Sequence, residues 1–132
     1  MPFVLDASVI ACWAFDDENH PHADKALAQI RTEEAMAPAL LWFEVRNILI
    51  VNERRKRLTA TDTIEFLRGL SKLPIIVDHK PDEGEVLRLA RLHCLTVYDA
   101  SYLELAQRKA CPLATLDTDL AKAARAEGVR LI

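Results

Sequence analysis

The sequence has few of the residues that mark secreted, membrane-spanning or zinc-binding chains. Its 132 residues include only three cysteines and three glycines, and no cysteines are spaced as CxxC. Scattered thiols suit neither a disulfide framework nor a zinc site, so we expect free, buried thiols and a cytoplasmic protein. No apolar run approaches the roughly 20 residues of a membrane span. The apolar N-terminus is interrupted by Asp6 and has no preceding basic residue, which argues against a signal peptide.

An excess of positive charge is also missing. The chain has 17 Lys and Arg against 20 Asp and Glu, for a formal net charge of −3. Proteins that coat nucleic acid are usually basic. If this chain handles nucleic acid, it needs a local basic patch or a cation that reverses the sign of an acidic site.

What is present is an alternation of apolar and amphipathic segments, enough for one domain over residues 1–132. The expected strands are PFVLD, AMAPA, PIIV, LTVY, PLATL and VRLI. Expected helices cover 8–14, 21–33, 39–56, 61–72 (with Thr61 as N-cap), 81–93, 99–109 and 118–126, and a loop holds DDENHPH. Such alternation predicts an α/β fold, a three-layer α/β/α sandwich around a short parallel sheet.

Three acids follow expected strands, namely Asp6 after FVL, Asp99 after TVY and Asp117 after LATL. In a parallel sheet all three would emerge at the carboxyl edge, where ligands bind. The alternative is that each acid caps the following helix. Capping does not explain three acids at one edge, and Ser101 with Glu104 forms a capping box that leaves Asp99 nothing to cap.

Glu44 is a fourth acid, on an apolar helical stripe between Leu40 and Ile48. A buried charge needs a partner or a metal, although an edge-of-core Glu could also pair with Arg46 or Asn47. Four neighbouring carboxylates repel one another, and a hard cation such as Mg²⁺ or Mn²⁺ removes that cost. Such a cation lowers the pKa of a bound water and stabilises charge on phosphate oxygens, which suits phosphoryl chemistry.

The ordered motifs VLDASV, FEVRN, YDASYLELA and LATLD resemble the PIN-domain ribonucleases, specifically the VapC toxins of toxin–antitoxin pairs, over nearly the whole chain. The resemblance implies Mg²⁺- or Mn²⁺-dependent cleavage of RNA, a homodimer, and an antitoxin that inserts a basic side chain into the acidic groove. It assigns catalysis and metal binding to Asp6, Glu44, Asp99 and Asp117, with Ser8, Thr115 and Asn47 in support.

Some roles stay open within this resemblance. Ser8 and Thr115 either orient a metal-bound water or only begin helices. Asp119 either shares the role of Asp117 or caps the last helix, and we favour the cap. His20 and His22, in the acidic loop, are more simply exposed polar residues than metal ligands.

Basic residues must hold the RNA backbone. Arg46, close to Glu44 on the same helix, is the favoured phosphate contact. Arg54, Arg55 and Arg57 belong to ERRKR, the densest basic run, whose alternative interpretation is a solvated helix end.

Two other functions compete. One is a non-catalytic binding module of the same fold, which a missing acid would favour, yet all four acids are present. The other is a phosphoacceptor receiver domain, which needs an acidic pair after the first strand, an acceptor Asp on the third and a Lys after the fifth. Here the first strand ends in Asp6 alone, and no Lys follows LATL until Lys122.

Overall fold

The computed structural model describes residues 1–15 and 17–132; Asp16, the first residue of the DDENHPH loop, lies outside the described residues. Within these residues the elements follow in chain order: β1 (Phe3–Leu5), α1 (Ala7–Trp13), α2 (Pro21–Ile30), β2 (Ala35–Pro38), α3 (Leu41–Arg54), α4 (Ala60–Leu70), β3 (Ile75–Asp78), α5 (Glu83–His93), α6 (Val97–Arg108), β4 (Leu113–Ala114) and α7 (Thr118–Ala126).

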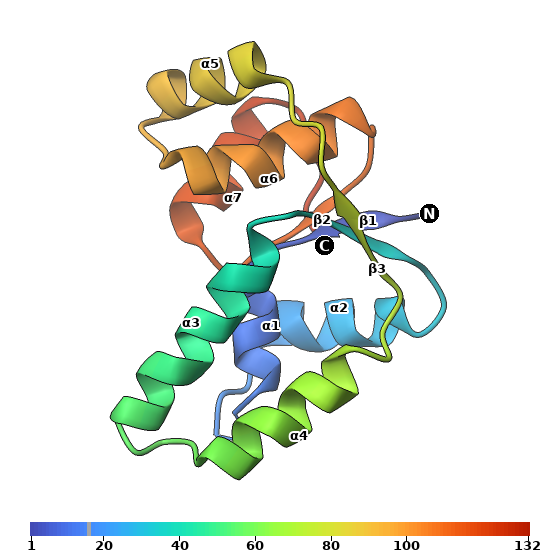
Figure 1. Ribbon diagram of the computed structural model, residues 1–132. Coiled ribbons are helices and arrows are strands. Elements are labelled where there is room, and N and C mark those ends of the chain that lie inside the picture. The colour runs from blue at the N-terminus through green and yellow to red at the C-terminus, as the bar shows by residue number, and fades with distance from the viewer. Residues whose placement is uncertain (16) are drawn as a thin grey trace.

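The strands form one parallel sheet in the order β3-β2-β1-β4. Helices α5, α6 and α7 lie on one side of the sheet and α1 to α4 on the other (Figure 1). The predicted three-layer α/β/α sandwich is therefore confirmed. The chain runs outward from β1 to β3 and then returns to place β4 on the other side of β1. This reversal of strand order lies between β1 and β4, where open α/β sheets bind their ligands.

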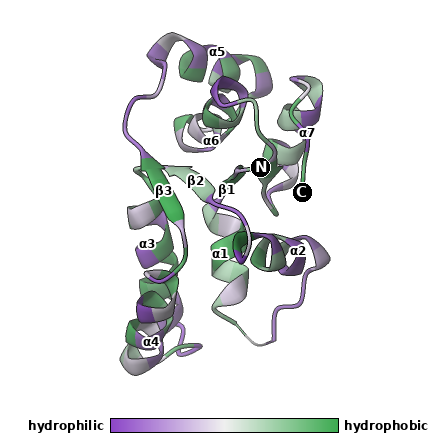
Figure 2. Ribbon diagram, turned by 90° about the vertical axis from the view of Figure 1, so that its right-hand side faces the viewer, coloured by the Kyte–Doolittle hydropathy of each residue, from purple (hydrophilic) through white to green (hydrophobic). Residues whose placement is uncertain are grey.

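The sheet is built from short apolar strands whose side chains are fully covered. Phe3, Val4 and Leu5 of β1 have no exposed surface, because helices pack on both faces of this central strand. The edge strand β3 is also strongly hydrophobic (Figure 2), yet Ile76 and Val77 are exposed. Burial of the central strands fixes the sheet, and the exposed β3 is the part of it left without cover.

The predicted strand LTVY is wrong. Thr96 is instead the N-cap of α6, and its hydroxyl accepts the Asp99 N–H at 3.0 Å. Val97 and Tyr98 occupy the exposed first turn of this helix, so their β-favouring side chains are not buried in the sheet. Asp99 thus reaches the carboxyl edge from the first turn of a helix rather than from the end of a strand.

Two other local predictions are corrected. Thr59, not Thr61, caps α4, because its hydroxyl and the Asp62 carboxylate form a reciprocal capping box. The segment VRLI forms only a bridge between Leu131 and Leu113.

The cysteines are free as predicted. Cys12 and Cys111 are buried, but Cys94 is exposed in the left-handed C-cap of α5. Among the helices of the described residues, none is long and apolar enough to cross a membrane.

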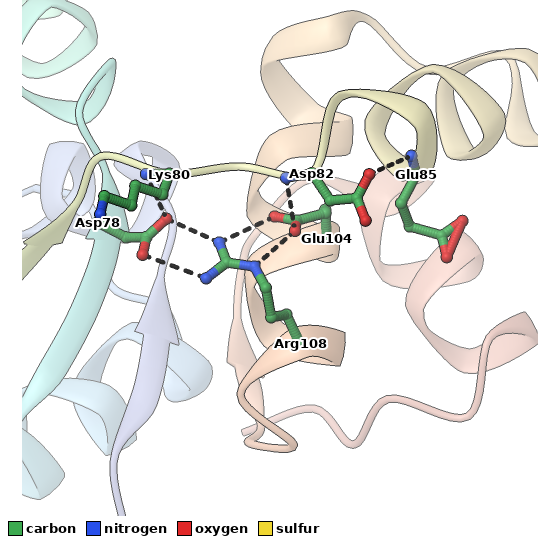
Figure 3. Close-up of polar contacts among 6 residues, drawn as sticks. All are labelled: Asp78, Lys80, Asp82, Glu85, Glu104 and Arg108. Carbon is green, nitrogen blue, oxygen red and sulfur yellow. Dashed lines mark hydrogen bonds and ion pairs between the residues drawn. The ribbon is translucent and has the colours of Figure 1, made fainter.

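Arg108 ties the end of β3 to α6 (Figure 3). Its guanidinium donates to Glu104 at 2.7 Å and to Asp78 at 2.7 Å, while the Asp82 N–H donates to Glu104 at 3.1 Å. The predicted capping box of Ser101 and Glu104 is therefore wrong, because Glu104 is buried and bound by Arg108. The Ser101 hydroxyl donates to the carbonyl of Tyr98. This network anchors α6, the helix that carries Asp99.

Candidate active site

Asp6 ends β1 and is held by two hydroxyl groups. Ser8 Oγ and Thr115 Oγ1 each donate to Asp6 Oδ2 at 2.7 Å. The same hydroxyl oxygens accept backbone N–H groups, from Leu116 at 2.9 Å and from Asp117 at 3.0 Å, which fixes the direction in which they donate. Asp6 makes no capping hydrogen bond to α1, so the capping alternative fails for this residue.

Glu44 lies in the first turn of α3 and is half-buried. Tyr102, fully buried on α6, donates its hydroxyl to Glu44 Oε1 at 2.5 Å. Burial raises the pKa of Glu44, the Tyr102 hydrogen bond lowers it, and the charges of Asp6 and Asp99 raise it further. The alternative, in which Glu44 pairs with Arg46 or Asn47, does not occur among the described residues, where Glu44 is bound by Tyr102 and Arg46 by the carbonyl of Trp42.

Asp117 follows β4 and caps α7. Its Oδ1 accepts the N–H groups of Asp119 at 2.9 Å and Leu120 at 3.1 Å. The predicted cap at Asp119 is therefore wrong, and Asp119 is exposed in the first turn. Asp99 does not cap its helix, because Thr96 does so. Capping accounts for one of the three acids that follow the apolar segments.

The four acids influence one another electrostatically. Burial, partly offset by hydrogen bonds from Thr115 and Ser8, raises the pKa of Asp6, with a further rise from the charge of Asp117. Burial also raises the pKa of Asp99, and the charges of Asp117 and Asp6 raise it further. Within the described residues no salt bridge joins any of the four to Lys or Arg. Among the described residues no ion pair therefore offsets their mutual repulsion.

Carboxylate oxygens are the type of ligand that a hard divalent cation prefers. In the described part of the chain, no three His, Cys, Asp or Glu side chains stand ready-made to hold a metal ion. The acids are therefore coupled without forming a closed cage. Mg²⁺ keeps several waters and needs only one or two direct carboxylates, so an open set of carboxylate oxygens suits it. A cation would also relieve the repulsion that raises the pKa values of Asp6, Glu44 and Asp99.

The other predicted site residues lie in several environments. Asn47 is exposed, and no hydrogen bond of its side chain occurs among the described residues. Arg46 lies 3.9 Å from the ring centroid of Trp42 and donates to the carbonyl of that residue. Arg57 forms ion pairs with Asp17 and Glu18. Arg54 and Arg55 are exposed at the end of α3. Arg46 and Arg57 thus have side-chain partners, whereas no ion pair of Arg54 or Arg55 occurs within the part of the chain that the structure describes.

Tyr102 is the residue that the sequence analysis missed. The spacing YDASY places it three residues after Asp99, next to that residue on the helix surface. A tyrosine on this side of an acid-bearing helix could have been identified as a donor to a neighbouring carboxylate.

Comparisons with known proteins agree with this arrangement. The PIN domain family model matches residues 3–126. Ribonuclease VapC3 of Pyrobaculum aerophilum is 33% identical over 125 residues, which cover 92% of this chain and 94% of that protein. The crystal structure of PAE2754 from Pyrobaculum aerophilum superposes with a TM-score of 0.75 at 25% identity, covering 99% of this chain and 89% of that one.

A more distant structure shares the fold alone. Mycobacterium tuberculosis VapC20, described as a Sarcin-Ricin loop cleaving toxin, matches with a TM-score of 0.63 at 14% identity. The match covers 92% of this chain and 94% of that one.

Proposed function

This chain belongs to the PIN domain family, and from that premise we propose that it is a Mg²⁺- or Mn²⁺-dependent endoribonuclease toxin of the VapC type. One observation carries the proposal. Asp6, Glu44, Asp99 and Asp117 come from four separate segments, and the pKa values of Asp6, Glu44 and Asp99 are each raised by the charge of at least one other member of this set. A purely structural protein gains nothing from this repulsion, whereas a cation site depends on it.

We assign the cation to Asp6, Asp99 and Asp117, with Glu44 beside them. When bound, it would activate water for attack on a phosphodiester and stabilise the charge on the phosphate. Ser8 and Thr115 hold Asp6 in place.

Glu44 suits proton transfer. Burial raises its pKa, which makes it a better proton acceptor than an ordinary glutamate. The Tyr102 hydroxyl orients its carboxylate and keeps it from turning away. Asn47 remains a candidate support for this group.

RNA would be held by basic side chains outside the acid site. We retain Arg54 and Arg55 as candidate phosphate contacts, because they are exposed and unpaired among the described residues. Arg46 lies closer to Glu44 in sequence and presents a guanidinium stacked on Trp42. Arg57 would have to leave Asp17 and Glu18 to bind RNA, so we expect it to contribute least.

The experiment is a cleavage assay with purified protein and mixed RNA. We expect cleavage with Mn²⁺ or Mg²⁺, its loss on adding EDTA, and its loss in Asp99→Asn. Glu83→Gln, an exposed acid in the first turn of α5, is the matched control and should cleave normally. If the protein binds Mn²⁺ and RNA but never cleaves, the non-catalytic binding module is the better description. Full activity in Asp99→Asn would refute the site assignment.

We further propose an antitoxin as a protein partner. An apolar groove of about 180 Å³ lies between α3, α4 and β3, and Leu41, Leu70 and Val77 help to line it. Its wall includes Trp42, two residues before Glu44, so a segment seated here could extend a basic side chain toward the acids. Co-expression with the protein encoded immediately upstream should suppress cleavage, and Val77→Glu should cleave RNA but escape suppression. Suppression of both proteins alike would place the partner elsewhere.

A homodimer is the second assembly we propose. Phe43 and Tyr98 are 70% and 62% exposed in the first turns of α3 and α6, on the two helices that carry Glu44 and Asp99. Exposed aromatic side chains of this kind are frequent at protein interfaces. Light scattering should give a dimer for the wild type and a monomer for Phe43→Ser. The free thiols support action in the cytoplasm.

A further inference from the structure

A pocket adjoins the acid site on the outer side of β4, between the start of α2 and α7. Its volume is about 250 Å³, and its polar lining comprises His20, His22, Thr115, Asp117, Thr118 and Arg125. We infer that this pocket is an RNA-backbone subsite that holds the phosphate of a nucleotide flanking the cleaved bond. The inference rests on the proposed ribonuclease function and extends it to a part of the chain with no assigned role.

The position of the pocket follows from two shared residues. Thr115 lines the pocket and donates to Asp6, and Asp117 lines the pocket and is one of the four acids. A nucleic acid strand that places one phosphate against the acids therefore has its next unit within reach of the pocket. Drug-sized ligands occupy pockets of about 300–1,000 Å³, so this smaller space suits one unit of a polymer better than a whole small molecule.

His20 supplies a donor without needing a second proton, and His22 shapes the pocket wall. His20 Nδ1 accepts the backbone N–H of His22 at 3.3 Å, so the neutral ring of His20 carries its hydrogen on Nε2. That N–H is then available to a phosphate oxygen. His22 Nδ1 is 3.0 Å from the Ile132 carbonyl oxygen, which can only accept, so this nitrogen carries a hydrogen and the contact fixes the ring at the pocket wall.

Arg125 supplies the positive charge. It is exposed in the last turn of α7, and no ion pair of this residue occurs among the described residues. An unpaired guanidinium matches a phosphate with two parallel hydrogen bonds. The Asp117 charge is partly compensated, because its Oδ1 accepts two backbone N–H groups of α7. The pocket thus offers cationic and neutral donors beside a carboxylate that is already hydrogen-bonded.

The test compares Arg125→Ala with Arg31→Ala. Arg31 is an equally exposed arginine directly after α2, near the start of β2 and so at the opposite edge of the sheet. Binding of a fluorescent single-stranded RNA is measured by anisotropy with Mn²⁺, in an Asp99→Asn background that prevents cleavage, at several salt concentrations.

We expect Arg125→Ala to weaken binding roughly threefold to tenfold. It should also reduce the slope of log K against log salt by about 0.7, the value for one phosphate contact on a single strand. In the cleaving protein, Arg125→Ala should raise KM and leave kcat unchanged. Arg31→Ala should change none of these quantities.

Equal effects of the two variants would overturn the subsite, as would an unchanged salt slope in Arg125→Ala. Because Arg125 is exposed, a melting curve for each variant should match its parent and exclude misfolding. If the wild type cleaves no RNA but Arg125→Ala still lowers the salt slope, the ribonuclease proposal fails and the subsite stands as an RNA contact. The two proposals therefore fail separately.

Discussion

Replacing Tyr102 by Phe removes one hydroxyl from the site and nothing else of consequence. That hydroxyl, fully buried, donates to Glu44 at 2.5 Å, and its pKa is raised by burial and by Glu44, so it remains a protonated donor. A hydrogen bond to a charged group contributes about 1.5–3 kcal/mol, and because Glu44 is half-exposed we expect a loss near the lower end. For a chain of this length that corresponds to a fall in Tm of roughly 4–8 °C.

The loss should depend on pH. The hydrogen bond lowers the pKa of Glu44, so it favours the charged carboxylate. The destabilisation in Tyr102→Phe should therefore be larger at pH 8, with Glu44 ionised, than at pH 4. Urea denaturation at the two pH values measures it, and kcat should fall because Glu44 is less well oriented. Tyr98→Phe is the control, an exposed tyrosine on the same helix with no hydroxyl partner among the described residues. An unchanged or higher Tm in Tyr102→Phe would refute the reasoning.

Other perturbations should act as follows. Asp99→Asn should abolish cleavage yet raise the unfolding free energy of the metal-free protein by on the order of 1 kcal/mol, visible as a higher Tm, because a repelling charge is removed. Because the pKa values of Asp6, Glu44 and Asp99 are raised in the fold, the metal-free native state binds more protons than the unfolded state, and the unfolding free energy should fall as pH rises from about 4 through these pKa values. Mn²⁺ should remove this fall. An unfolding free energy from urea denaturation that does not change with pH in the metal-free protein would contradict the prediction. Thr115→Val should cost roughly 1–3 kcal/mol in urea denaturation and slow cleavage, because Asp6 loses a buried donor. Arg108→Met should lower the unfolding free energy by about 2–3 kcal/mol in the same assay, because buried Glu104 loses its ion-pair partner. Adding Glu104→Gln to this variant should restore much of the lost stability.

The sequence was sufficient to predict the sandwich and the placing of Asp6 and Asp117 at one edge of the sheet. Short apolar segments alternating with amphipathic ones permit few arrangements other than a covered parallel sheet. The same topology brings Asp6 and Asp117 together on either side of the strand reversal, so their proximity follows from strand order alone. Glu44 stood out because a charge interrupts an apolar helical stripe.

Local details depended on burial, which the sequence does not reveal directly. Val97 and Tyr98 have strand-forming side chains, but they lie exposed in a helical turn that Thr96 caps. Ser101 and Glu104 have the spacing of a capping box, yet both lie inside α6. The Tyr102–Glu44 hydrogen bond joins residues 58 positions apart, so it depends on the tertiary arrangement of the whole chain and not on local sequence.

The central claim is that three distant carboxylates, Asp6, Asp99 and Asp117, hold one hard cation, and calorimetric titration with Mn²⁺ tests it most directly. Wild-type protein should bind Mn²⁺, and Asp6→Asn, Asp99→Asn and Asp117→Asn should each weaken binding by about tenfold or more. The last variant is informative because Asn caps a helix as well as Asp does, so the fold of α7 should persist. Absence of Mn²⁺ binding to the wild type, or binding by all three variants as tight as that of the wild type, would contradict the account.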